Sequence, residues 1–169
     1  WSRGLGDVYK RQGIPSVRGR CIRWIEMPNT QGRCRPLPAK DGAFSCPFCD
    51  PPADRVLFQG ECVFGLWDSY PVAPRHALVI PRRHVSCLFE ATSDEQEELL
   101  EVLTAVRSKV LEAHSDIAGF NIGVNDGRAA GQTVDHLHIH LIPRYAGDHP
   151  DPTGGVRHVI PGKANYLRA

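Results

Sequence analysis

Three histidines alternate with aliphatic residues toward the C-terminal end of this 169-residue chain. Residues 136–142 place imidazoles at His136, His138 and His140 and Leu or Ile between them. Successive side chains of a β-strand point to opposite faces, so we expect a strand with one apolar face and one imidazole face. Imidazoles need hydrogen-bond partners and titrate near neutral pH, which makes three on one face poor packing groups. The pattern favours metal binding, nucleophilic attack or proton transfer.

The segments around this strand predict the elements that position it. Val, Ile and aromatic residues predict strands at 56–60, 61–67, 77–80 and 120–124, with the apolar 77–80 strand in the middle of a sheet. A helix is expected to start at Ser93, with Gln96 completing a capping box. Its buried stripe is expected to contain Leu99, Leu103, Val106 and Val110, and its acidic run 94–98 to face solvent.

A glycine-rich loop at 125–131 joins the 120–124 strand to the histidine strand. Glycine lets the backbone approach a bound group closely. Two strands and this loop are therefore expected to converge on one site.

The overall composition, 41% hydrophobic with a formal net charge of +1, is that of one globular domain. No apolar run approaches the roughly 20 residues that cross a bilayer, so we expect a cytoplasmic protein without a membrane partner. Residues 1–40 are basic, but their nine Lys/Arg are interspersed with Gly and Pro and lack helical periodicity, so nucleic-acid binding is not expected.

The domain is expected to begin at residue 44, where the composition changes, and to continue to 169 with a C-terminal extension from about 146. Residues 1–43 are assigned as an N-terminal extension. Within it, residues 7–12 match the translated end of a transposon adaptor used in sequencing libraries, so residues 1–12 are interpreted as an adaptor artefact.

Residues 131–144 closely resemble the signature of the histidine triad (HIT) family, and residues 68–72, 78–84 and 121–127 match further family segments in the same order. The resemblance covers roughly residues 44 to 145. The tail motifs at 154–157 and 159–161 resemble an extension of bacterial members that hydrolyse diadenosine polyphosphates. The resemblance implies an α+β fold with a central antiparallel sheet and a long helix packed on it. It also implies a homodimer that binds purine nucleotides.

Carried over residue by residue, the resemblance assigns roles to positions of this chain. It makes His138 the nucleophile that attacks the α-phosphorus and His140 a group that stabilises the phosphate oxygens. The other substrate-binding positions that it implies are Asn125, Gly131, Gln132 and Thr133 for phosphate, Asp68 for ribose, and Phe48, Leu66 and Ser69 for the base.

The resemblance also implies a structural zinc site, because relatives bind zinc through a Cys-x-x-Cys pair and two histidines. The matching residues are Cys46, Cys49, His84 and His136. Four nitrogen and sulfur ligands form the closed tetrahedral site typical of structural zinc. The alternative is a pair of reduced thiols and a His136 that bonds to backbone, and Cys87 is a competing ligand.

The resemblance implies a hydrolase that cleaves dinucleoside polyphosphates through a covalent nucleotidyl-histidine intermediate. Two alternatives remain: a nucleotidyltransferase or phosphorylase that uses the same histidine, and a regulatory protein that binds nucleotide without turnover. Two residues depart from the family pattern. Arg75 occupies a position where Gly is usual, which is expected to alter the turn before His76, and Thr153 replaces an Arg of the tail motif. His76 itself is expected to be a packing residue.

Overall fold

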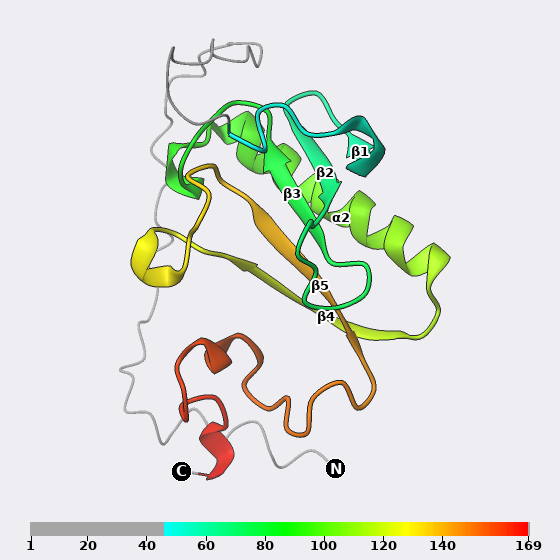
Figure 1. The fold of residues 1–169 in the computed structure, drawn as a ribbon, viewed down its shortest axis with the longest axis vertical. Helices are drawn as coiled ribbons and strands as arrows, with labels where there is room; N and C mark the ends of the chain where they lie inside the picture. Colours follow the sequence, from blue (N-terminus) through cyan, green and yellow to red (C-terminus); the bar gives the residue numbers. More distant parts are fainter. Residues whose placement is uncertain (1–45, 169) are drawn as a thin grey trace, which may run out of the picture. The chain divides into compact units, whose positions relative to one another are not determined.

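The computed structural model describes residues 46–168, and the predicted extension 1–43 and domain start at 44 lie outside them. A five-stranded antiparallel sheet forms the centre of the described part (Figure 1). Its strands lie in the order β1-β2-β3-β5-β4, so the chain's last strand is inserted between β3 and β4. Their bounds are β1 Val56–Gln59, β2 Val63–Trp67, β3 Ala77–Pro81, β4 Ile117–Val124 and β5 Ile139–Tyr145.

The sheet confirms the expected strands and the central position of β3. Every residue of β3 is buried, which agrees with its unbroken apolar sequence. Short 3-10 helices occupy parts of the connections, and their bounds are Ala53–Arg55, Leu88–Glu90, Arg128–Ala130, Gly155–Val159 and Tyr166–Arg168.

The histidine strand is shorter than predicted, because β5 begins at Ile139 and His136 and His138 precede it. Ile139 is the first residue that pairs with both Val79 and Val124. Just before it, the amide of Leu137 donates to the carbonyl of Val85. Val85 belongs to a loop and not to a strand, so the regular strand pairing of β5 cannot extend to residue 137. The alternation still holds: Leu137 lies in the core, while the rings of His138 and His140 lie 4.9 Å apart.

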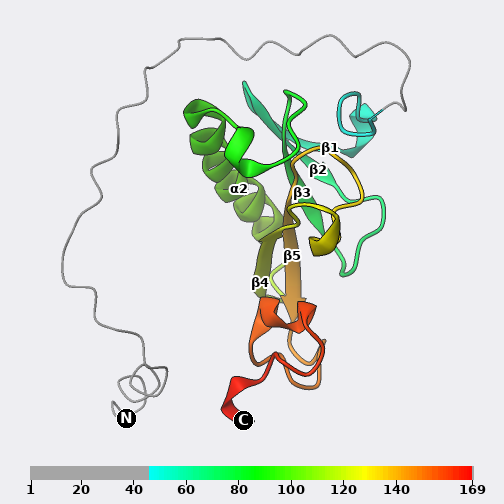
Figure 2. The ribbon, with the colours of Figure 1, turned by 90° about the vertical axis from the view of Figure 1, so that its left-hand side faces the viewer.

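One long helix, α2 (Ser93–Ala113), packs on one face of the sheet (Figure 2). Its N-cap is Thr92, one residue earlier than predicted. The Thr92 side chain accepts from the Glu95 amide and the Glu95 carboxylate accepts from the Thr92 amide. The predicted capping box at Ser93 and Gln96 is therefore wrong by one residue, because threonine also caps well and has glutamate at the third position.

The buried stripe of α2 and its acidic run also differ in part from the prediction. Leu99, Val106 and Val110 are buried as expected, but Val102 is buried where Leu103 is only half-buried. The acidic run is not all solvated, because Glu95 is only 1% exposed and pairs with Arg83. Patterns of charge alone do not show that a carboxylate has a buried partner elsewhere in the chain.

The two faces of the sheet are packed differently. The larger apolar cluster joins α2 to one face and includes Val79, Leu137, Ile139 and Leu141. The opposite face has a smaller cluster of Phe48, Phe64, Leu66, Leu78 and Ile80, and His138 and His140 lie on this side. Among the described helices none has the length and apolar character needed to span a membrane.

Candidate active site and metal-ligand cluster

The middle histidine is held in one tautomer by the backbone. Nδ1 of His138 lies 2.7 Å from the carbonyl oxygen of His136, and a carbonyl can only accept, so Nδ1 carries the hydrogen. The lone pair is consequently on Nε2. This nitrogen forms no hydrogen bond with any described residue, yet no side-chain nitrogen or oxygen in that part is both buried and unpaired. Nε2 of His138 is therefore open to solvent, although the residue is only 6% exposed.

The last histidine of the triad is oriented by a fourth one. Nε2 of His76 lies 3.0 Å from Nδ1 of His140. The amide of Val72 donates to Nδ1 of His76 at 3.4 Å, which leaves the hydrogen of His76 on Nε2, from where it is donated to His140. His140 then carries its own hydrogen on Nε2, the correct form for donating to an oxygen anion.

Asp68 competes for the same nitrogen of His76, because its Oδ2 lies 3.2 Å from Nδ1 and would favour the opposite tautomer. We assign the tautomer from the Val72 contact, which has hydrogen-bond geometry, whereas the Asp68 contact is an electrostatic approach only. The other oxygen of Asp68 accepts from the amide of Tyr70. Oδ2 thus remains available to a ligand hydroxyl.

Burial favours the neutral forms of both His76 and His140. Burial first, and then the neighbouring His138 and His76, lower the pKa of His140 to about 4. Burial also lowers the pKa of His76, although the nearby Asp68 carboxylate opposes this. The site thus presents imidazoles with fixed hydrogens and carries little positive charge before a ligand binds.

The glycine-rich loop is held by its own hydrogen bonds. Gln132 accepts from the amide of Gly127 at 2.7 Å and donates to the carbonyl of Ser86 at 2.8 Å. The amides of Gly131 and Gln132 donate to Arg128 and Gly127 within the loop, so neither is free for a phosphate in this arrangement. Gly127 and Gly131 both have a positive φ, which explains the need for glycine there.

Two predicted phosphate-binding side chains remain available. Asn125 is half-buried beside Gly131 and Thr133 is exposed, and neither side chain forms a hydrogen bond with a described residue. Their amide and hydroxyl groups can therefore donate to a ligand.

The three predicted base-binding residues differ in their surroundings. Phe48 is nearly buried, and its ring lies 5.1 Å from that of His138. Leu66 is fully buried in the same smaller cluster as Phe48, so it offers no surface of its own to a base. Ser69 is exposed in the loop after β2.

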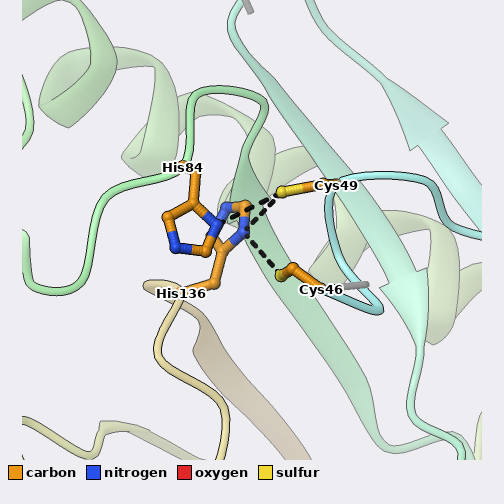
Figure 3. Close-up of side chains that lie close together, drawn as sticks. All are labelled: Cys46, Cys49, His84 and His136. Atoms are coloured by element: carbon orange, nitrogen blue, oxygen red, sulfur yellow. Dashed lines mark hydrogen bonds between the residues drawn. The ribbon is translucent and has the colours of Figure 1, made fainter. Parts of the chain in front are cut away.

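All four predicted metal ligands lie together (Figure 3). Sγ of Cys46 is 3.4 Å and Sγ of Cys49 is 3.7 Å from Nδ1 of His136, and Cys49 is 3.2 Å from Nδ1 of His84. Zinc–sulfur and zinc–nitrogen bonds at a tetrahedral angle separate the two ligand atoms by about 3.6 Å. The donor types and their spacing thus fit a tetrahedral zinc ion.

The surroundings of His136 support the same interpretation. Its Nε2 lies 2.8 Å from the carbonyl oxygen of Pro81, so the hydrogen is on Nε2 and the Nδ1 lone pair faces the two thiols. Burial lowers the pKa of His136 to about 4, which keeps this lone pair free. Burial, with a contribution from Cys46, raises the pKa of Cys49 to about 11. A bound cation would offset this cost of forming the thiolate. Cys87 is not part of the cluster.

The sequence predicted that His76 is a packing residue and did not reveal that it orients His140. It did single out Arg75, in the turn before His76, as unusual. The partner of His76 lies 64 residues away, and no spacing in the sequence indicates it. Arg75 has a φ of 65°, the single positive value for a non-glycine among the described residues. This positive φ falls at the position where the family resemblance expects glycine, and the expectation that Arg alters the turn stays a prediction.

These features define a class of protein: an α+β domain with neutral, oriented imidazoles and free hydrogen-bond donors on the sheet face opposite its helix. A family model described as the HIT domain matches residues 52–147. The chain belongs to the HIT family.

The chain is similar to proteins with described activities. It is 38% identical over 94 residues to an AP-4-A phosphorylase of Mycobacterium tuberculosis, covering 55% of this chain and 48% of the relative. It is 42% identical over 90 residues to a bis(5'-adenosyl)-triphosphatase of Dictyostelium discoideum, covering 53% of this chain and 59% of the relative. The chain thus spans about half the length of these curated relatives.

A solved structure from Sulfolobus tokodaii, a hypothetical histidine triad nucleotide-binding protein, superposes with a TM-score of 0.57 at 35% identity. The superposition covers 63% of this chain and 73% of the other. It supports the expected α+β fold with a central antiparallel sheet.

Proposed function

We propose that this domain cleaves purine dinucleoside polyphosphates at the α-phosphorus through a covalent nucleotidyl-His138 intermediate. The observation that carries the proposal is the tautomer of His138, whose Nδ1 is held 2.7 Å from the His136 carbonyl while Nε2 is open. A neutral imidazole with a fixed, accessible lone pair is an effective nucleophile toward phosphorus. The similarity to a bis(5'-adenosyl)-triphosphatase and an AP-4-A phosphorylase supports this substrate class.

In the first step, the Nε2 lone pair of His138 bonds to the α-phosphorus and the bond from phosphorus to the leaving phosphate oxygen breaks. The leaving polyphosphate takes the electron pair and is stable as an anion, so it needs no proton. Meanwhile Nε2–H of His140, with Asn125 and Thr133, donates to the phosphate oxygens as their charge increases.

In the second step, water attacks the phosphorus, His138 regains its electron pair as the phosphorus–nitrogen bond breaks, and the proton of the water is released to solvent. Asp68 holds the ribose hydroxyls through Oδ2, and Phe48 and Ser69 border the base. Gly131 and Gln132 are proposed to shape the loop around the phosphate, and their amides would contact it after exchanging their present partners.

A phosphorylase is the second candidate, favoured by the AP-4-A phosphorylase relative. Its second step would use inorganic phosphate in place of water. Incubation with diadenosine tetraphosphate distinguishes the two: AMP and ATP formed without phosphate support the hydrolase, and ADP and ATP formed only with phosphate support the phosphorylase. Tight binding without turnover supports a regulatory protein and contradicts both.

The covalent intermediate has its own test. His138→Asn should abolish turnover and the adenylyl adduct that mass spectrometry detects after rapid alkaline quenching, which preserves the acid-labile phosphorus–nitrogen bond. His114→Asn, at the C-terminal end of α2, is the matched control and should keep both. An adduct that persists in His138→Asn would refute the proposed nucleophile.

We further propose that Cys46, Cys49, His84 and His136 bind zinc, supported by their donor types and separations. The ion would hold the loop 46–49 and residue 84 against the segment that precedes the nucleophile, and would take no part in the reaction. Elemental analysis of the Cys46→Ser/Cys49→Ser variant tests this: wild-type protein should contain about one zinc per chain and the variant none. Equal zinc in both would refute these ligands.

We also propose that the domain is a cytoplasmic homodimer. The outward-facing Leu100 on α2, 65% exposed, supports an apolar contact along this helix. Light scattering should give twice the chain mass, and Leu100→Glu should reduce it to one chain. A wild-type monomer at micromolar concentration would contradict the dimer.

A further inference from the structure

A cavity of about 650 Å³ extends from the triad toward the C-terminal tail, residues 146–168. It begins at His76 and His140, passes Asn125 and continues along β4 and β5 to Val156 and Val159 in the tail. Figures 1 and 2 show the tail, in orange to red, at the β4–β5 end of the sheet, away from β1. The volume is within the range of roughly 300–1,000 Å³ that small-molecule sites occupy.

The tail that forms this wall is held by contacts of its own. Arg144 bonds to both oxygens of Asp148 at 2.7 and 2.8 Å, and Arg157 donates to the carbonyls of Lys163 and Ala164. Asn165 donates to Asp151 at 2.8 Å. Gly154 approaches Ala164 so closely that an added Cβ would lie 2.0 Å from its carbonyl oxygen. The wall is therefore a folded element.

The tail lies on the reactive face of the sheet. Phe120 and Val124 of β4 pack in the α2 cluster, so the alternating Asn121 points to the opposite face. A Cβ built at Gly155 of the tail would lie 3.4 Å from the Asn121 side-chain nitrogen. The histidines and the tail consequently share one side of β4 and β5.

The chemistry of the cavity changes along its length. At the triad end, His140 and Asn125 offer hydrogen-bond donors that suit phosphate oxygens. At the tail end, Val156 and Val159 are 58% and 78% exposed, and Val72, from the loop before β3 and next to His76, is 73% exposed. Exposed aliphatic side chains that border one cavity are suited to covering an aromatic ring, since burial of their apolar surface is favourable.

We propose that the C-terminal tail forms a binding subsite for the second nucleoside of a dinucleoside polyphosphate, the half that leaves when His138 attacks. The inference rests on the proposed function and adds the residues that recognise the leaving group. Binding energy from this distant half of the substrate positions the α-phosphorus and so increases kcat/KM.

Two substrates that differ only in this half test the inference: diadenosine tetraphosphate and adenosine 5'-tetraphosphate. Cleavage at the α-phosphorus of either leaves the same adenylyl group, but the second substrate lacks the distal nucleoside. Val159→Asp places a charge in the subsite and should lower kcat/KM for diadenosine tetraphosphate about tenfold. Its kcat/KM for adenosine 5'-tetraphosphate should stay within about twofold of wild type.

Ile160→Asp is the matched control, because Ile160 is the next residue, is 57% exposed and does not border the cavity. It should leave both substrates unaffected. An equal loss on both substrates in Val159→Asp, or no loss on either, would overturn the subsite. If the wild-type protein cleaves neither substrate, the proposed function itself fails, which is a different result from a functional enzyme whose tail variants do not discriminate.

Discussion

His76 fixes the hydrogen-bonding state of His140, the histidine proposed to contact the phosphate oxygens. The amide of Val72 sets the tautomer of His76, and His76 in turn sets that of His140. A donor that is already oriented needs no reorganisation when charge develops on the phosphate oxygens.

The His76→Phe substitution tests this positioning role. It keeps a buried ring but leaves Nδ1 of His140 without its donor, so we expect kcat/KM to fall by about 10²-fold. His76→Gln, whose amide can still donate, should recover part of the loss. Nitrogen chemical shifts of His140 should show a changed tautomer in the Phe variant, and an unchanged tautomer with full activity would contradict the assignment.

The positive φ of Arg75 leads to a prediction about stability. At a φ of 65°, a residue with a Cβ is strained by roughly 1–2 kcal/mol, and glycine is not. We therefore expect Arg75→Gly to be more stable than Arg75→Ala by about 1 kcal/mol, the reverse of the usual order in regular structure. Both variants lose the Arg75 contact with the Trp67 ring, so that contact cancels in the comparison. Urea unfolding measures the difference, and a more stable Ala variant would refute the strain.

At the scale of elements, the close approach of α2 to β2 depends on a missing side chain. A Cβ built at Gly65 would lie 2.6 Å from a methyl group of Val106, in the centre of the helix. Helix and sheet therefore meet at a distance that only glycine allows.

Gly65→Ala should lower the free energy of unfolding by about 1–3 kcal/mol through overpacking. Gly119→Ala, in β4, is the matched control, because nothing lies within 4 Å of its added Cβ. Adding Val106→Ala to Gly65→Ala should restore part of the stability by removing the opposing methyl groups. Equal stability of the two single variants would contradict the close approach.

The start of α2 is joined to the loop after β3 by a buried ion pair. Arg83 donates to both oxygens of Glu95 at 2.9 and 2.7 Å, and the Thr92 amide donates at 2.8 Å. Burial alone would raise the pKa of Glu95, but these hydrogen bonds more than offset it and the pKa lies below its ordinary value of 4.5. The pair therefore stabilises the fold above that value, and the contribution is lost as the pH falls through the lowered pKa.

Glu95→Gln should cost about 2 kcal/mol at pH 7, because Arg83 loses a charged partner. The difference from wild type should shrink as the pH falls below 4.5, where the carboxylate is protonated first in the unfolded state and then, at the lowered pKa, in the folded state. The exposed neighbour Glu97→Gln is the control and should match wild type at each pH. A pH-independent difference would show that the charge of Glu95 does not contribute.

At the scale of the whole domain, the Cys–His cluster joins three distant parts of the chain. It contains residues from the segment before β1, the loop after β3 and the segment before β5. A ligand that binds only the folded state stabilises it by a free energy that grows with the logarithm of the ligand concentration relative to Kd.

Chelation of the proposed zinc should therefore lower Tm. At a metal concentration of about 1,000 times Kd the stabilisation is about 4 kcal/mol, or roughly 10 °C for a chain of this size. Differential scanning calorimetry with and without a chelator measures the shift. The Cys46→Ser/Cys49→Ser variant should already melt low and should not respond, and a wild-type Tm that ignores the chelator would contradict a structural ion.

Local patterns predicted much of this fold. The unbroken apolar sequence of β3 indicated a central strand, and the spacing of Leu99, Val106 and Val110 indicated the helix face that packs on the sheet. The features that the sequence did not reveal are those that depend on a distant partner. Whether Glu95 is solvated or buried depends on Arg83, and whether His76 packs or orients depends on His140.

The start of β5 could not be predicted for the same reason. The alternation of residues 136–141 is that of a strand throughout, but a ladder also needs a neighbour, and the backbone of Leu137 meets the loop at Val85. The relation of the candidate site to the tail was equally out of reach, since it depends on how the chain folds back after Tyr145.

His136 takes part in two arrangements at once, because its ring faces the thiols of Cys46 and Cys49 while its carbonyl oxygen accepts from His138. The contact of the ring with the thiols and the contact of the carbonyl with His138 are thus joined by the covalent bonds of one residue. Chemical modification of Cys46 or Cys49 would therefore shift His136 and, through its carbonyl oxygen, the ring of His138, the proposed nucleophile. Alkylation of the cysteines should slow the proposed reaction without blocking substrate binding.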